Sequence, residues 1–378
     1  MSKRREPDDF RWRELFHRPL LDTDVVRLSG ANAGKTILLT GAGGSIGSAL
    51  AKAILASGPR LLILLDHSDH NLHGIQNVLA AASNRAPFIS FLGDVCDAPL
   101  LAEVLEEYRP DTIFHAAAFK HVPLMEINPF AAVRNNSMGT YRLATAAMEH
   151  QTPRMIMIST DKAVNPHSVM GASKRIAELI LLALNNRGTR MSAVRMGNVV
   201  GTQGSVVPLF LGQIARGGPV TVTHPRVRRY LVTLLESVEV ILKVASLENE
   251  DGIFVPEMGS PIKIVDLANY LIRNAGSAPS QEISVAFTGL RPGDKMTEDL
   301  ISERESLGPG TDGSIHRVSG LGIPRDTLEA AMRELAGAVC RRDLAALLDT
   351  IRRMVPKYQP SRAVLEQLSI SLAGARKA

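Results

Sequence analysis

The chain has 378 residues, of which 45% are hydrophobic and 21% are charged, and its formal net charge is +5 at pH 7. This composition excludes a disordered or fibrous chain and is typical of a globular protein with one large domain or two packed domains. The basic residues are scattered and only 4% of residues are aromatic, so we expect no nucleic-acid partner.

Three features of the sequence bear on where in the cell the protein is located. The longest apolar runs, at residues 61–65 and 179–184, fall far short of the ~20 residues that a membrane span needs. The N-terminal stretch MSKRREPDDFRWRELF lacks the apolar core of a secretory signal. Cys96 and Cys340 are the only cysteines, so neither a disulfide framework nor a cysteine metal site is expected. The sequence therefore predicts a cytoplasmic protein without a membrane span or a bound metal.

Residues 1–35 are predicted to be an N-terminal extension, and regular elements begin at residue 36. Short β-rich runs then alternate with helical patterns, at 36–40, 60–66, 88–95, 111–118, 154–160 and 191–200. Continuous apolar runs of this length are typical of a parallel sheet covered on both faces. The intervening segments repeat apolar residues with helical spacing, as at Ile46, Ala49 and Leu50. We therefore predict an α/β fold, a Rossmann-like doubly wound parallel sheet over residues 36–201.

After about residue 202 the pattern loosens, because glycine and proline increase and the expected strands, at 220–223 and 283–287, are short. Residues 202–300 are predicted to form a smaller substrate-binding region, interleaved with the last elements of the sheet. The basic run at 226–229 follows a strand and suits an anionic ligand as well as plain solvation. Helical patterns at 326–339 and 341–355 predict a C-terminal helical cap over residues 301–378.

The stretch TGAGGSIG, residues 40–47, follows a predicted strand and opens a predicted helix. That context is required of a dinucleotide-binding turn. Gly41 permits the tight turn, Gly44 allows the backbone to approach a pyrophosphate, and Gly47 allows close packing of helix on strand. The backbone amides of Ser45 and Ile46 begin the helix, where they can meet phosphate oxygens.

The ends of the next strands supply further candidate contacts to a cofactor. Asp66, followed by His67, ends the second strand, where a carboxylate can bind both ribose hydroxyls and repel a 2′-phosphate. This favours NAD over NADP. Asp94 and Val95 end the third predicted strand and are expected near the adenine. The small residues that end the fourth strand, Ala116, Ala117 and Ala118, can pass under the cofactor, although close packing alone would also explain them.

Together with Asn136 and Lys174, these motifs resemble the extended short-chain dehydrogenase/reductase superfamily over residues 36–300. The resemblance implies that Asn136, Ser159 and Lys174 contact the cofactor. In that superfamily a Tyr-x-x-x-Lys pair supplies the acid–base group and holds the nicotinamide ribose. Here the pair is Met170-Gly-Ala-Ser-Lys174, and none of the five tyrosines has a lysine four residues later.

Four longer segments give a narrower match: HAAAFKHVPLMEINPFAAVRNNSMGT, STDKAVNPHSVMGASKR, VRMGNVVGTQGSVVPLF and GLRPGDKMTEDL. They resemble the polysaccharide-biosynthesis dehydratases that act on UDP-N-acetylglucosamine. Larger, membrane-attached members carry methionine at the tyrosine position beside a Thr-Asp-Lys triplet. This chain resembles their catalytic part without the membrane-spanning half, and it has Ala49 where the family usually has glutamate. The family also suggests a homo-oligomer of at least two subunits.

The resemblance implies NAD-dependent 4,6-dehydration of a UDP-N-acetylhexosamine. Such a reaction oxidises C4, eliminates water across C5 and C6, and returns the hydride to C6, so it needs an acid and a base. As in the family, Asp161 is assigned to protonating the C6 leaving group and Lys162 to taking the C5 proton. Met170 is expected to pack against the sugar or the nicotinamide. Deprotonation of the C4 hydroxyl is left open among Thr160, Asp161, Lys174 and water.

The same resemblance implies which residues bind the substrate. Asn198 and Arg291 resemble diphosphate contacts, and a guanidinium suits bidentate phosphate binding. The remaining candidate contacts to the substrate are Lys120, His121, Glu126, Val207 and Glu298, and Glu126 is expected to orient its loop. Lone histidine and lysine residues on loops are as readily explained by solvation. Two other function classes remain open: a UDP-sugar 4-epimerase or 4-reductase, and a non-catalytic protein that binds NAD or a nucleotide sugar.

Overall fold

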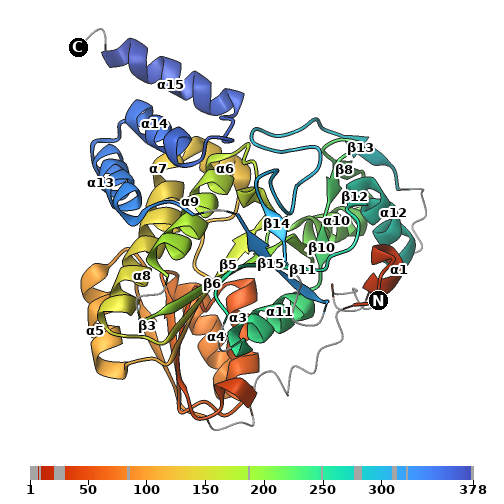
Figure 1. Cartoon of the computed structure of the whole chain (residues 1–378). Helices are drawn as coiled ribbons and strands as arrows, with labels where there is room; N and C mark the ends of the chain where they lie inside the picture. The colour runs from red at the N-terminus through yellow and green to blue at the C-terminus, as the bar shows by residue number, and fades with distance from the viewer. Residues whose placement is uncertain are drawn as a thin grey trace.

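The computed structural model describes residues 7, 10–20, 30–82, 86–185, 188–247, 250–275, 283–308, 313–320 and 322–375. At its centre lies a nine-stranded sheet of order β14-β15-β11-β6-β5-β4-β1-β2-β3 (Figure 1). The seven strands from β11 to β3 are parallel, whereas β15 runs antiparallel to β11 and to β14. The predicted doubly wound parallel sheet is therefore confirmed. Its strands are β1 (Thr36–Thr40), β2 (Leu61–Asp66), β3 (Phe88–Leu92), β4 (Thr112–His115), β5 (Arg154–Thr160), β6 (Arg190–Met196), β11 (Gly252–Pro256), β14 (Ser306–Leu307) and β15 (Ile315–Ser319).

The central strands read as continuous apolar runs because both of their faces are covered. In β1 the side chains of Ile37 and Leu39 lie in one core cluster, and Leu38 lies in the other. All three are fully buried. Since successive side chains of a strand point to opposite faces, a strand between two layers must be apolar at every position.

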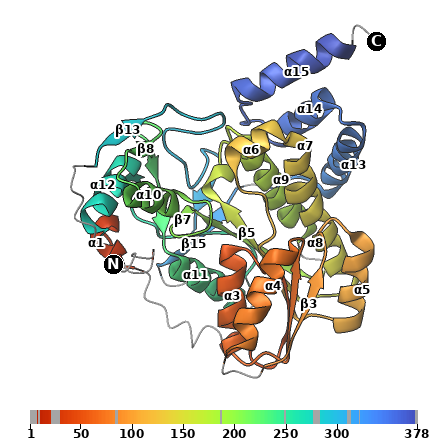
Figure 2. The same ribbon diagram turned by 180° about the vertical axis from the view of Figure 1, so that it is seen from behind.

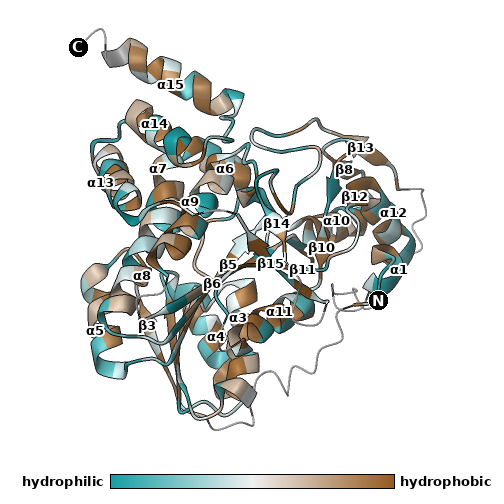
Figure 3. Ribbon diagram, viewed as in Figure 1, coloured by the Kyte–Doolittle hydropathy of each residue, from teal (hydrophilic) through white to brown (hydrophobic). Residues whose placement is uncertain are grey.

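Helices cover both faces of the sheet. The cluster that contains Ile37 is completed by α3 (Ser45–Ala56), α4 (Asp69–Ala80) and α11 (Leu234–Ser246); Figure 2 shows α3 and α4 in front of the strands. The opposite cluster takes in the helical elements α5 (Ala98–Tyr108), α6 (Val122–Ile127), α7 (Pro129–Ala132), the π-helix η3 (Val133–Met138), α8 (Gly139–Glu149) and α9 (Val169–Leu184). Hydrophobic and hydrophilic residues alternate along α5 and α13 in Figure 3, as expected of amphipathic helices.

A second lobe has its own apolar core, and part of the predicted N-terminal extension belongs to it. Phe10 and Trp12 pack in this core with Tyr270, and Arg18 pairs with Glu236 of α11 at 2.6 Å. The basic cluster at residues 3–5 lies outside the described residues. The elements of this lobe are α1 (Trp12–Phe16), β7 (Asn198–Val199), α10 (Val206–Ala215), β8 (Val220–Val222), β9 (Arg228–Arg229), β10 (Leu231–Val232), β12 (Ile262–Lys263), α12 (Ile264–Asn274) and β13 (Val285–Phe287). The short 3₁₀ turns are η2 (Gly30–Asn32) and η4 (Asp161–Ala163).

The last third of the chain returns to the sheet before it becomes helical. Strand β11 completes the parallel set, and β15 and β14 extend it, although only helices were expected after residue 301. The burial of the side chains varies along β15 because the strand lies near the sheet edge. Ile315 is buried, whereas Arg317 is exposed. The helices α13 (Arg325–Arg341), α14 (Leu344–Met354) and α15 (Arg362–Ala375) follow. No helix in the described ranges is long and apolar enough to cross a membrane.

Candidate active site

The glycine-rich turn between β1 and α3 has the backbone that its sequence predicts. Gly41 has φ +68°, and a Cβ there would lie 2.5 Å from the backbone nitrogen of Ala117. Gly44 precedes α3, and a Cβ on Gly47 would collide with the carbonyl oxygen of Gly41. The first N–H groups of α3, at Ser45 and Ile46, have no partners within the helix. The turn is therefore shaped to present backbone donors to an anion.

Asp66 ends β2 beside this turn and is almost fully buried. Its two carboxylate oxygens accept hydrogen bonds from the backbone nitrogens of Gly43, at 2.8 Å, and Ser68, at 2.9 Å. Each oxygen keeps lone pairs for further donors. The exposed ring of His67 lies edge-on to Phe119, 5.9 Å away. Asp66 is thus held in a fixed orientation at the mouth of a pocket.

Asp94 lies in the loop after β3, across the same pocket. Burial raises the pKa of Asp94, but hydrogen bonds from the Cys96 amide and from Arg134, both 2.8 Å long, outweigh it and the pKa falls below its usual value. Nine of the residues that were predicted to bind the cofactor line this pocket: Gly41, Gly44, Asp66, His67, Asp94, Val95, Ala116, Ala117 and Ala118. The sequence did not point to the other lining residues, which are Leu65, Asn71, Gly93, Phe119 and Asn135.

Asn136 holds the loop after β4 against helix α9. Its Oδ1 accepts from the Phe119 amide at 2.8 Å, and its Nδ2 donates to the Phe119 carbonyl and to Ser173 Oγ, both at 3.0 Å. The side chain is fully buried within the π-helix η3. The wider turn of a π-helix is frequent at functional sites, but no sequence pattern predicted one here. Asn136 therefore positions the loop that carries residues 116–118.

Lys174 lies on α9 with 4% of its surface exposed. Burial lowers the pKa of Lys174 to about 8, although Glu178 partly opposes the shift. Burial, and Lys174 itself, lower the pKa of His115 to about 3. Ser159, which was also predicted to contact the cofactor, donates its hydroxyl to Glu178 at 2.7 Å. Its donor is thus used within the protein, and only its oxygen lone pairs are available to a ligand.

The residues predicted to act as acid and base lie at the carboxyl end of β5. Asp161 has no exposed side-chain surface, and its Oδ1 accepts from Lys162 Nζ at 2.9 Å and from Thr160 Oγ1 at 3.0 Å. Lys162 also donates to Asn198 Oδ1 at 2.7 Å. Asp161 Oδ2 is buried and accepts no hydrogen bond from the described residues. An adjacent Asp and Lys can also be a solvated surface pair, and the burial of Asp161 is at odds with that alternative.

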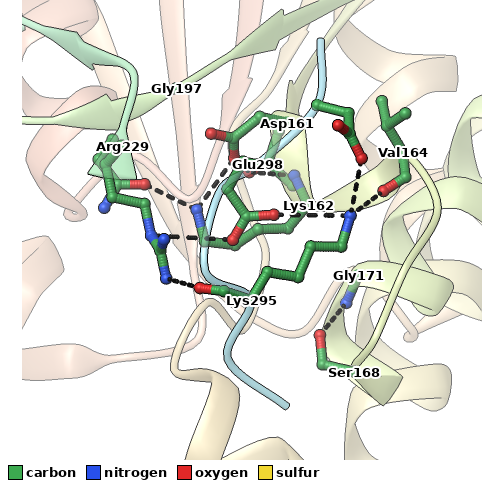
Figure 4. Close-up of polar contacts among 12 residues, drawn as sticks. Asp161, Lys162, Val164, Ser168, Gly171, Gly197, Arg229, Lys295 and Glu298 are labelled. Atoms are coloured by element: carbon green, nitrogen blue, oxygen red, sulfur yellow. Dashed lines mark hydrogen bonds and ion pairs between the residues drawn. The ribbon is translucent and has the colours of Figure 1, made fainter. Parts of the chain in front are cut away.

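Three residues from distant parts of the chain complete this arrangement (Figure 4). Glu298 is buried, and its carboxylate lies 3.8 Å from Arg229 Nε and 3.8 Å from Lys295 Nζ. Burial raises the pKa of Glu298; Lys162 opposes this shift and Asp161 adds to it. Glu298 was predicted as a substrate contact, whereas Arg229 and Lys295 were not singled out. Only the basic run at 226–229 hinted at Arg229.

The predicted substrate residues are not all gathered at this pair. Lys120 Nζ donates to the Gln203 carbonyl at 2.8 Å, and the ring of His121 lies against Gly204. Both contact the loop before α10. Glu126 Oε1 accepts from the Val169 amide at 2.7 Å, so Glu126 orients the start of α9 rather than its own loop. The exposed Arg291 pairs with Asp294 at 2.9 Å.

Two predicted side chains are packed in the protein. The side chain of Val207 is fully buried in the core of the second lobe, so it cannot touch a substrate as predicted; only its backbone N–H, in the first turn of α10, remains able to. Met170, in the first turn of α9, is 3% exposed and belongs to the core cluster on that face of the sheet. Within the described ranges, no group of three or more His, Cys, Asp or Glu side chains could hold a metal ion.

The chain is similar to several known proteins. A family model described as "Polysaccharide biosynthesis protein" matches residues 37–319. The capsular polysaccharide biosynthesis protein CapD of Staphylococcus aureus is 45% identical over 295 residues, which are 77% of this chain and 49% of that protein. This chain thus spans about half the length of that relative. A UDP-N-acetylglucosamine 4,6-dehydratase (inverting) of Campylobacter jejuni is 34% identical over 72% of this chain and 79% of that enzyme. A UDP-glucose 4-epimerase of Rickettsia rickettsii is 32% identical, with the same coverage.

Solved structures share the fold. Pen from Bacillus thuringiensis superimposes with a TM-score of 0.68 at 26% identity, covering 80% of this chain and 98% of that one. DesIV, a dTDP-glucose 4,6-dehydratase from Streptomyces venezuelae solved with NAD and TYD, gives 0.63 at 21% identity, covering 82% and 98%. The sheet order, the turn after β1 and the buried lysine of α9 define the class as the extended short-chain dehydrogenase/reductases. The chain belongs to the polysaccharide biosynthesis protein family whose model covers residues 37–319.

Proposed function

We propose that this protein catalyses the NAD-dependent 4,6-dehydration of a UDP-N-acetylhexosamine, with UDP-N-acetylglucosamine as the substrate. The observation that carries the proposal is the hydrogen-bonded Asp161–Lys162 pair at the carboxyl end of β5. Ligands of doubly wound sheets bind at that edge. Elimination of water needs an acid for the departing oxygen and a base for the C5 proton, and adjacent carboxyl and amine groups provide both.

The residues around the pocket fit a dinucleotide. A Cβ at Gly41 or Gly43 would collide with Ala117 or Asn71, so the turn carries no side chain at these positions, and the first amides of α3 face it. Asp66 would accept the ribose hydroxyls, and the described residues that line the pocket include no lysine or arginine for a 2′-phosphate. When bound, NAD would take a hydride from C4 of the sugar and return it to C6. Calorimetric titration should therefore show much tighter binding of NAD than of NADP; equal affinities would contradict the role of Asp66.

Each proton transfer would be carried out by a different residue of the chain. Asp161 would deliver a proton to the C6 oxygen, and Lys162 would take the C5 proton. Thr160, whose hydroxyl donates to Asp161 at 3.0 Å, would link the sugar to that carboxyl. Lys174 would hold the nicotinamide ribose, and Met170 would pack without transferring protons. That this methionine replaces the tyrosine of the superfamily stays a prediction.

The alternative is a 4-epimerase, which is also among the named relatives. An epimerase only removes and returns a hydride at C4, so it has no use for an acid at C6 or a base at C5. The test is incubation of the chain with UDP-N-acetylglucosamine and NAD, followed by NMR of the product. A 4-keto-6-deoxy sugar supports dehydration, and UDP-N-acetylgalactosamine supports epimerisation.

Two further parts of the proposal concern setting. We place the reaction in the cytoplasm, where nucleotide sugars and NAD are available together. We also expect the chain to act as a homo-oligomer of at least two subunits, as the family resemblance implies. Light scattering of the purified chain would measure its assembly.

A further inference from the structure

Glu298 is a buried acid near the Asp161–Lys162 pair, and its surroundings indicate a role other than contact with the substrate. Its side chain is 3% exposed, and its Oε2 accepts no hydrogen bond from the described residues. Asp161 Oδ2, in the same group of side chains, is also buried without a hydrogen bond there. Buried carboxylate oxygens are normally satisfied, so two such atoms beside one lysine point to a working site rather than to packing.

The segment that carries Glu298 is fixed to the catalytic loop. Lys295 Nζ donates to the carbonyl of Val164 at 2.8 Å, joining residues 131 positions apart in the sequence. The guanidinium of Arg229 donates to the carbonyl of Lys295 at 3.0 Å. Figure 4 shows Glu298 between these two cations and the Asp161–Lys162 pair. These two hydrogen bonds to backbone carbonyls therefore tie the segment of Glu298 to the end of β5 and to the second lobe.

The charges around Glu298 nearly balance. Three cations, Lys162, Arg229 and Lys295, and one acid, Asp161, face it. Asp299 pairs with Lys295 from a half-exposed position at 3.4 Å, and the phenol of Tyr230 faces Asp161 and Asp299. If Glu298 and Asp299 offset Arg229 and Lys295, the Asp161–Lys162 pair is neutral by itself. A proton can then move between the two without creating an unbalanced buried charge.

We propose that Glu298 is a positioning residue of the acid–base site, whose carboxylate offsets the cations around the Asp161–Lys162 pair and allows Asp161 to hold a proton. This inference rests on the proposed dehydration. In that reaction the C5–H bond breaks, its proton goes to Lys162, and its electron pair moves onto the C4 carbonyl as an enolate. The enolate then collapses, the C5=C6 bond forms as the C6–O bond breaks, and the proton of Asp161 leaves with the oxygen as water. Between these steps Lys162 is an ammonium beside a neutral Asp161, and Glu298 keeps the positive charge of Arg229 and Lys295 from adding to it.

The test compares Glu298→Gln, which keeps the size and removes the charge, with Glu298→Asp, which keeps the charge. Glu303→Gln is the matched control, because Glu303 lies on the same segment with its side chain 82% exposed. Loss of the carboxylate leaves an excess of positive charge, which weakens proton binding by both Asp161 and Lys162. Glu298→Gln should slow dehydration at least about tenfold and move its pH optimum down by roughly one unit. Glu298→Asp should keep the unsubstituted optimum and recover part of the rate.

A second readout does not depend on turnover. The Nζ resonance of Lys162, followed by NMR of ¹⁵N-lysine-labelled protein, should lose its proton at a lower pH in Glu298→Gln than in the unsubstituted chain or in Glu303→Gln. An unmoved Nζ titration in a folded Glu298→Gln protein would overturn the inference. So would a uniform loss of rate with an unchanged pH optimum. If the unsubstituted chain forms no 4-keto-6-deoxy product, the proposed function fails, and the Nζ titration alone decides the role of Glu298.

Discussion

Asp161 and Lys162 are adjacent in the sequence but differ in environment. Asp161 is fully buried, whereas 20% of the Lys162 side chain is exposed. The lysine is held on its other side by Asn198, so the two groups meet in one fixed geometry. A pair held in this way can deliver a proton at one carbon and take one at the next, which is what elimination requires.

The first prediction separates the chemical steps at Asp161. Asp161→Asn should still oxidise C4 but stall before water leaves, because an amide cannot donate a proton to the departing oxygen as an acid does. Reduced cofactor should accumulate after UDP-N-acetylglucosamine is added, visible in the nicotinamide absorbance, while no 4-keto-6-deoxy product forms. Loss of one general acid typically costs about 10²- to 10⁴-fold, so slow turnover is compatible. A folded variant that binds the sugar nucleotide without forming reduced cofactor would instead place Asp161 in the oxidation step.

The second prediction concerns Met170, which is packed in the core at the start of α9. If it only fills space, Met170→Leu should keep substantial turnover, since the exchange nearly conserves volume and neither side chain transfers protons. Steady-state rates and a thermal melt measure this. Complete loss of activity in a folded variant that binds NAD would assign the thioether a chemical role.

At the scale of elements, helix α9 joins the site to a buried ion network. Glu178 accepts from Arg175 at 2.6 Å and from Arg195 at 2.8 Å, and both arginines also pair with Glu305. The network connects α9, β6 and the segment before β14. It also holds Ser159, the residue before Thr160, so it braces the end of β5 on which the catalytic pair sits.

The third prediction follows from Glu178. Arg195 and Arg175 outweigh the effect of burial and lower the pKa of Glu178 to about 2 from its ordinary value near 4.5. A lowered folded-state pKa means that the stabilisation is complete above about pH 5 and is lost as the pH falls from there toward 2. Glu178→Gln should lower the free energy of unfolding at pH 7 by about 3 kcal/mol or more, because it leaves buried arginines with one acid fewer.

Denaturant unfolding at pH 7 and at pH 3.5 tests this third prediction. The difference between Glu178→Gln and the unsubstituted chain should shrink at the lower pH. Glu366→Gln, which removes an exposed partner of Arg362, is the control and should change little at either pH. A Glu178→Gln protein as stable as the unsubstituted chain at pH 7 would contradict the account of the network.

The sequence predicts local features well and long-range pairs poorly. The turn at residues 40–47 and the end of β5 follow from strand and glycine patterns over a few residues, so Gly41, Asp66 and Asp161 could be placed in advance. The approach of Lys295 to Val164 depends on how the second lobe folds back over the sheet, and no local pattern encodes it. The same is true of Arg195 with Glu305, which are 110 positions apart. Strand β15 was missed because a partly exposed strand beside the sheet edge needs no continuous apolar run.

At the scale of the molecule, the sheet and the second lobe contribute different residues to the candidate site. The sheet positions the turn, Asp66 and the Asp161–Lys162 pair along one edge, whereas the second lobe supplies Asn198, Arg229 and the segment of Glu298. Each lobe has its own apolar core, and side chains from both meet at Lys162. The proposed reaction site therefore needs residues from both lobes.

The most direct measurement runs the reaction in D₂O with UDP-N-acetylglucosamine and follows the product by proton NMR. If Lys162 exchanges the C5 proton with solvent while the C4 hydride returns to C6, the product carries a C6 methyl group and deuterium at C5. The methyl signal should then be a singlet rather than a doublet. UDP-N-acetylgalactosamine that retains its C5 proton, with no methyl signal, would contradict the central claim that the Asp161–Lys162 pair eliminates water.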